Sequence, residues 1–167
     1  ATPTESRYAV SHSLPFYADF FTITADLTCT WGATDSADAK ALGIIISAGA
    51  AYDSNNYLAL ERQKGTSINR FTVSGKLNNV AVTTTSVNTT DDIVALKIQR
   101  YDNVWRFYYS TVQYPSEVWT LISQIEDPSV YMTNQVTMYF EAYSKGSADT
   151  ESAQADFDTF RYLIGSG

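Results

Sequence analysis

The sequence contains little of what metal, redox and nucleic-acid chemistry requires. Cys29 is the only cysteine and His12 the only histidine among 167 residues, so the chain has no intrachain disulfide and no cysteine-rich or histidine-rich metal site. Lys and Arg number 11 against 18 Asp and Glu, which gives a net charge of -7. Nucleic-acid binders show a basic surface. We therefore expect neither a nucleic-acid partner nor attraction to an anionic membrane.

Long hydrophobic runs are missing as well. No apolar stretch approaches the roughly 20 residues needed to span a bilayer, and residues 1–13 lack the basic start and apolar middle of a signal peptide. A chain of this length is expected to form one domain. We predict a single soluble domain over residues 1–167, cut from a larger protein, with a core at about 19–163 and tails at 1–13 and 165–167.

What the sequence does contain is a series of short segments in which β-branched and aromatic residues alternate with polar ones. Such segments, broken by Gly, Asn, Asp and Ser, are typical of strands. Asn78-Asn79 and Asp102-Asn103 are predicted to form tight hairpin turns. The predicted strands are 20–30, 41–47, 56–63, 68–73, 80–85, 93–101, 104–111, 119–125, 136–144 and 155–163.

About ten strands in one domain favour two packed antiparallel sheets, an all-β sandwich with apolar residues inside. The period of two assigns side chains to faces. Trp105, Phe107 and Tyr109 form an apolar set that we expect to lie toward the core, whereas Arg106 and Tyr108 lie on the other side. Cys29 falls in a similar alternation and is predicted to be a small buried side chain.

The order of the segments resembles that of a known fold family. The matching stretches are 19–27, 42–46, 56–60, 94–100, 105–110 with the following Trp119, 136–144 and 155–160. Together they are similar to the concanavalin A-like lectin/glucanase superfamily, and within it to the C-terminal β-sandwich modules of family 43 glycoside hydrolases and to laminin-G-like domains. The resemblance covers most of residues 19–163 but rests on short motifs.

The resemblance implies a curved jelly roll whose concave sheet often binds glycans. It also implies a structural calcium ion held by an acidic residue of the last strand. The matching residue is Asp158, with Asp156 as the second choice. Oxygen ligands of this kind suit Ca²⁺. The alternative is that both are ordinary solvated acids in an acidic chain.

Glycan binding is the first functional hypothesis. Sugar rings stack on aromatic faces while their hydroxyls need fixed polar partners. The outward faces of the predicted strands supply both, and we expect cross-strand neighbours among them to form one patch. Tyrosine is also a good strand former, so the alternative that these tyrosines serve only the fold stays open. The candidate ligand-binding residues are Tyr57, Lys97, Gln99, Arg106, Tyr108, Tyr139, Glu141 and Tyr143.

Two other functions remain open. A jelly-roll glycoside hydrolase or lyase needs two carboxylates facing each other across a cleft, and Glu61 and Glu141 meet this need if their strands lie in one sheet. The ExDxxE motif of laminarinase-like relatives is absent, so we expect no enzyme. A structural or adhesion spacer without a ligand is the third possibility. The favoured prediction is a non-catalytic glycan-binding module of an extracellular or cell-surface protein, tethered to other domains.

Overall fold

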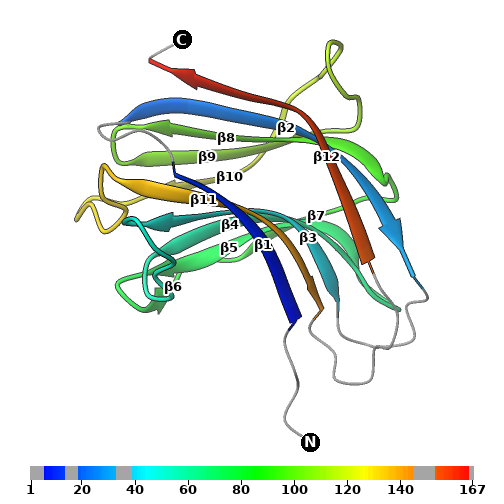
Figure 1. Cartoon of the computed structure of the whole chain (residues 1–167), viewed down its shortest axis with the longest axis horizontal. Helices are drawn as coiled ribbons and strands as arrows, with labels where there is room; N and C mark the ends of the chain where they lie inside the picture. Colours follow the sequence, from blue (N-terminus) through cyan, green and yellow to red (C-terminus); the bar gives the residue numbers. More distant parts are fainter. Residues whose placement is uncertain (1–5, 14–18, 33–38, 145–152, 166–167) are drawn as a thin grey trace, which may run out of the picture.

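The structure, a computed structural model, describes residues 6–13, 19–32, 39–144 and 153–165. It is an all-β sandwich of two antiparallel sheets, as predicted (Figure 1). Within these residues no helix is long and apolar enough to cross a membrane.

One sheet has seven strands in the order β1-β11-β3-β4-β5, with β6 and β7 both paired to β5. The other has five strands in the order β10-β9-β8-β2-β12. The first sheet comprises β1 (Ser6–Ser13), β11 (Val136–Ser144), β3 (Lys40–Ala48), β4 (Tyr57–Lys64), β5 (Asn69–Leu77), β6 (Val80–Ala81) and β7 (Thr85–Asn88). The second comprises β10 (Thr120–Glu126), β9 (Val104–Ser110), β8 (Ile93–Tyr101), β2 (Phe20–Trp31) and β12 (Ala153–Ile164).

Both sheets bend in the same direction. In Figure 1 the long strands β2, β12 and β11 curve together, so the outer face of the seven-stranded sheet is concave and that of the five-stranded sheet is convex. The inward side chains of the two sheets interdigitate to form one core. Large members of this core are Phe21, Ile23, Leu27, Leu42, Ile44, Ile46, Phe71, Trp105 and Phe107.

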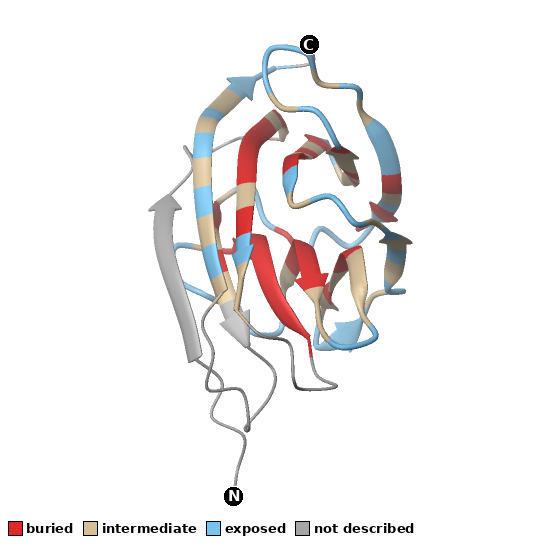
Figure 2. Ribbon diagram, turned by 90° about the vertical axis from the view of Figure 1, so that its right-hand side faces the viewer, coloured by how far each residue is buried: buried red, intermediate tan, exposed pale blue. Residues whose placement is uncertain are grey.

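Burial falls off toward one edge of the sandwich. Figure 2 shows buried residues along the inner strands, whereas β12 alternates between intermediate and exposed residues along its length. Cys29 packs in the core as predicted, and burial raises the pKa of its thiol to about 12. A thiol in this environment is a packing group rather than a nucleophile.

Two buried arginines fasten loops at the ends of the core. Arg62 of β4 is fully buried, and its guanidinium donates to the carbonyls of Gln63 and Asp91 and to the side chains of Asn69 and Asp92. Arg100 of β8 donates in the same way to three backbone carbonyls, which belong to Asp102, Met132 and Thr133. A buried charge needs such a full set of partners.

The structure corrects two details of the strand prediction. Residues 6–13, expected within a tail, form β1, which pairs with β11 along its whole length. Backbone hydrogen bonds hold such an edge strand, so its polar sequence gives little signal. Residues 80–85, expected as one strand, are divided between β6 and β7. The turn at Asn78-Asn79 is confirmed, because both residues have a positive φ and Leu77 pairs with Val80.

Candidate functional site

The structure divides the predicted ligand-binding residues between two surfaces. Tyr57, Tyr139 and Glu141 lie on outward positions of the concave sheet, whereas Lys97, Gln99, Arg106 and Tyr108 lie on outward positions of the convex sheet. The expectation of one patch is therefore wrong, because β8 and β9 belong to a different sheet from β4 and β11. Tyr143 pairs with Ala41 in the register, and its side chain lies outside the described part of the chain.

On the convex face, the predicted cross-strand neighbours are confirmed. Lys97 lies opposite Tyr108, and Gln99 lies opposite Arg106. The Lys97 ammonium lies 4.2 Å from the centroid of the Tyr108 ring and 4.7 Å from that of Trp119. Desolvation lowers the pKa of Lys97, and the nearby charge of Glu117 partly opposes this. These contacts give Tyr108 a packing role that needs no ligand.

The loop between β9 and β10 covers part of this convex face. Its Gln113 side chain donates to the carbonyls of Leu27 and Val94, and the Tyr114 backbone N–H donates to Asp26. Arg161 of β12 pairs with Glu117, and its guanidinium also lies over the ring of Tyr114. Outward residues of β2 are consequently buried, Asp26 among them.

The centre of the concave face is formed by a glycine between two glutamates. Gly43 of β3 lies directly between Glu61 of β4 and Glu141 of β11 in the register, so both glutamates share one sheet face. Gly43 itself cannot carry a side chain, because a Cβ there would lie 2.2 Å from the carbonyl oxygen of Leu60. The outward residues next to it are buried, namely Ala41, Ile45 and Ala59. The two carboxylates thus flank a floor at Gly43 that carries no side chain.

Glu61 of β4 supplies one of the two carboxylates of this face. It is only 6 % exposed. Within the described residues no hydrogen bond or ion pair involves its carboxylate. Thr72 lies directly opposite Glu61, but its hydroxyl contacts Gln63 and Ser86 instead. The Glu61 oxygens are not among the fully buried side-chain atoms that lack a partner, so they stay within reach of water or of a ligand's hydroxyl groups.

A polar row extends the floor toward β7. Gln63 Oε1 accepts hydrogen bonds from Arg70 Nε and Thr72 Oγ1, and the Thr72 hydroxyl also meets Ser86 Oγ. These residues come from β4, β5 and β7 and hold one another in fixed rotamers. The row presents amide, guanidinium and hydroxyl groups in a defined order along the concave face.

Tyrosines gather at the other end of the concave face. Tyr52, 42 % exposed on the β3–β4 loop, lies with its ring centroid 5.8 Å from that of Tyr57 and 5.9 Å from that of Tyr139. The loop is held by Asp53, whose backbone N–H donates to Ser47 Oγ. Hydrogen bonds from Asn56 and Asn55 lower the pKa of the Asp53 carboxyl. The three rings offer aromatic surface at a fixed place.

The predicted calcium ligands lie on β12 at the convex face. Asp156 and Asp158 are exposed, and their carboxylates accept hydrogen bonds from the Gln154 amide and the Thr159 backbone N–H. Asp158 is directly opposite Asp26 on β2. Like charges placed opposite one another repel, and a cation there relieves the repulsion. No group of three or more acidic, His or Cys ligands forms among the described residues. The calcium site stays a prediction.

Comparison with solved structures assigns the fold. A functionally unknown protein from Saccharomyces cerevisiae superposes with a TM-score of 0.68 at 10 % identity, over 95 % of this chain and 74 % of that one. The family 43 glycoside hydrolase BlXynB from Bacillus licheniformis gives 0.67 at 21 % identity, over 88 % and 28 %. Lectin II from Ulex europaeus gives 0.61 at 10 % identity, over 98 % and 84 %. The chain has the concanavalin A-like lectin/glucanase fold.

This concanavalin A-like assignment confirms the resemblance drawn from the sequence segments. It concerns the fold alone, since the identities are low. The chain spans 28 % of the length of the Bacillus hydrolase. No protein-family model matches the sequence, and the search of curated proteins finds no match.

Sequence reasoning missed two parts of the concave site. Tyr52 lies in a loop, where no period assigns a face. Gly43 looks like an ordinary strand glycine until the carbonyl of Leu60 is placed beside it. An isolated glycine within a strand pattern does indicate a close backbone approach, and this was the one available signal.

Proposed function

We propose that the chain is a non-catalytic glycan-binding module and that the glycan lies along the concave face of the seven-stranded sheet. The observation that carries the proposal is the Glu61 carboxylate, which has no hydrogen-bond donor among the described residues, next to Gly43, where no side chain fits. Sugar hydroxyls are donors of the required kind. The Tyr52, Tyr57 and Tyr139 rings then supply the aromatic surface on which sugar rings stack.

Charge narrows the class of glycan. Glu61 and Glu141 flank the floor, and Arg70 already bonds Gln63. A uronic acid at the floor meets the carboxylate of Glu61 and is repelled. The site therefore favours a neutral glycan. The fold is shared with lectin II and with a region of the Bacillus family 43 hydrolase, and this supports glycan binding and tethering within a larger chain.

A glycan array followed by titration of the strongest neutral hit tests the proposal. Glu61→Gln keeps the size of the side chain but removes the charged acceptor, so binding should weaken about tenfold or more. The matched control is Glu126→Gln, the same change at an exposed residue of the convex sheet. It should leave both affinity and melting temperature unchanged.

A second matched pair separates the two faces. Tyr139→Ala should weaken binding about tenfold, whereas Tyr108→Ala on the convex face should leave it unchanged. If Tyr108→Ala weakens binding and Tyr139→Ala does not, the glycan binds on the convex face and the proposal is wrong.

A hydrolase is the second candidate, because the register puts Glu61 and Glu141 on one face with a single strand between them. Two strand spacings separate the backbones by roughly 9.6 Å, and inverting hydrolases place their carboxylates about 6.5–9.5 Å apart. Incubating the chain with the glycan it binds distinguishes the candidates. Release of reducing ends that both Glu61→Gln and Glu141→Gln abolish establishes the hydrolase, and unchanged glycan supports the binding module.

A further inference from the structure

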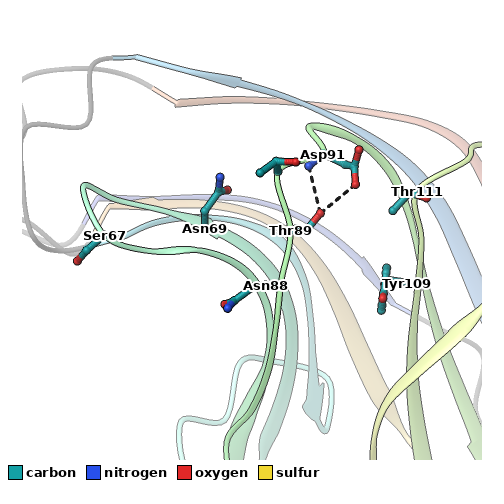
Figure 3. A pocket seen from close by; sticks show the side chains of 8 residues that line it. Ser67, Asn69, Asn88, Thr89, Asp91, Tyr109 and Thr111 are labelled. Atoms are coloured by element: carbon teal, nitrogen blue, oxygen red, sulfur yellow. Dashed lines mark hydrogen bonds between the residues drawn. The ribbon is translucent and has the colours of Figure 1, made fainter.

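An open cavity of about 600 Å³ lies at the rim of the sandwich (Figure 3), next to the end of the polar row, because Asn88 in its lining pairs with Arg70 of that row. Its walls come from both sheets: Asn69 begins β5, Asn88 ends β7 and Tyr109 belongs to β9. It shares no residue with the concave site described above. Its volume falls within the range of roughly 300–1,000 Å³ that is usual for small-molecule sites. The complete lining is Ser67, Asn69, Asn88, Thr89, Thr90, Asp91, Tyr109 and Thr111.

One wall of the cavity is aromatic. Tyr109 was expected to lie toward the core, and its ring does stack on Phe71, with centroids 4.6 Å apart and planes 25° from parallel. Tyr109 is nevertheless only half-buried and also lines the cavity. Phe71 therefore fixes the ring while part of its surface stays open to a ligand.

The opposite wall is polar and rigid. The Thr89 hydroxyl donates to Asp91 Oδ2 and accepts from the Asp91 backbone N–H (Figure 3). The Thr89 backbone N–H donates to the Asn69 carbonyl. Behind this wall, the buried Arg62 guanidinium donates to Asn69 Oδ1 and to the carbonyl of Asp91. Because Arg62 occupies the amide oxygen of Asn69, the NH₂ group of that side chain remains as a donor.

The lining defines a class of ligand. Its eight residues include one carboxylate, Asp91, and no Lys, Arg or His, so it repels anions and offers them no partner. The remaining groups are amides and hydroxyls next to one aromatic ring. This combination of stacking surface and short-range donors and acceptors suits a sugar.

We propose that this cavity is a second carbohydrate site, which binds a short neutral oligosaccharide against Tyr109 and the Asn69–Asp91 wall. The site does not depend on binding at the concave face. A module with both sites engages one polysaccharide at two points or cross-links two chains, and either arrangement raises avidity.

NMR titration of the ¹⁵N-labelled chain tests this site separately from the concave face. The neutral probes are xylotriose, cellotriose and maltotriose, and the anionic probe is trigalacturonic acid, each at millimolar concentration. At least one neutral trisaccharide should saturably shift the amide signals of Asn88, Thr89 and Thr111, while trigalacturonic acid should not. If no neutral probe shifts these signals, or if the anionic probe shifts them as strongly, the proposal is overturned.

Variants then assign the shifts to the cavity. Thr111→Val keeps the shape of an exposed side chain but removes its hydroxyl, and Asn88→Trp places a large ring at the rim; both positions are exposed, so the fold should tolerate them. Affinity should fall several-fold in the first and be lost in the second, whereas Gln124→Ala on β10 should bind as the wild type does. Wild-type affinity in Asn88→Trp overturns the proposal. Tyr109→Phe, which keeps the ring, should retain more affinity than Tyr109→Leu, and the reverse order contradicts stacking.

Discussion

On the convex face Lys97 lies between the rings of Tyr108 and Trp119, whereas on the concave face Glu61 lies shielded with no described donor. Both faces carry the same mixture of tyrosine and charge at alternate positions. The convex face uses it to hold the β9–β10 loop through the contacts of Lys97 with Tyr108 and Trp119. On the concave face, the Glu61 carboxylate has no hydrogen-bond or ion-pair partner among the described residues. The difference shows that curvature and the covering loop decide which polar face is available to a ligand.

The floor of the concave face gives the largest predicted effect on stability. Gly43→Ala places a Cβ 2.2 Å from the carbonyl oxygen of Leu60 and 2.8 Å from Glu61 Cα, so backbone must move. We expect the free energy of unfolding to fall by about 3 kcal/mol, measured by urea denaturation. Ser74→Ala on the neighbouring strand β5 is the control and should stay close to wild type. A wild-type midpoint for Gly43→Ala contradicts the close approach.

Calcium binding on the convex face is expected to stabilise the fold. An ion bound at Asp158 should stabilise the fold by about 2.7 kcal/mol at a free concentration of 100 times Kd, and EDTA should reverse this. Asp158→Ala should abolish the shift in melting temperature, whereas Asp102→Ala, in the exposed β8–β9 turn, should retain it. An identical melting temperature with calcium and with EDTA would contradict the predicted calcium site.

The contacts of Lys97 predict an effect on stability without one on binding. Trp119→Ala removes a ring that contacts the partly desolvated Lys97 ammonium. The free energy of unfolding should therefore fall by about 2 kcal/mol. Thr120→Ala, next to it on β10, serves as the control. Glycan affinity should not change in either variant. A loss of affinity in Trp119→Ala, at unchanged stability, would move the binding site to the convex face.

The core between the two faces gives an effect that is absent at neutral pH and appears only in alkaline solution. Burial raises the pKa of the Cys29 thiol from 9.0 to about 12. The thiol thus stays protonated in the folded chain at pH values where the unfolded chain loses the proton. This contribution to stability is complete below pH 9 and is lost between pH 9 and 12, by about 1.4 kcal/mol for each pH unit. Cys29→Ala should flatten the decline in urea midpoint above pH 9, and equal slopes would argue against burial of the thiol.

Local pattern was enough to predict most of the fold. The alternation of Trp105 and Phe107 with Arg106 and Tyr108 correctly assigns the faces of β9. The turn at Asp102 correctly makes Lys97 and Tyr108 cross-strand neighbours. Hairpins and faces are local properties, so a period of two suffices for them.

The arrangement of the candidate site is not local. Whether Glu61 and Glu141 share a face depends on β11 lying beside β3 and β4, and β11 is far from both in the chain. For the same reason the sequence could not separate Tyr139 from Tyr108. The Tyr109 cavity depends likewise on β5 and β7 meeting β9 across the two sheets.

The most direct test of the account is a crystal structure of the chain with its strongest neutral glycan from the array. The account predicts a sugar over Gly43, with a hydroxyl within hydrogen-bond distance of the Glu61 carboxylate and a ring stacked on the tyrosines around Tyr52. A glycan bound instead over Lys97, Tyr108 and Trp119, with the concave face empty, would contradict it.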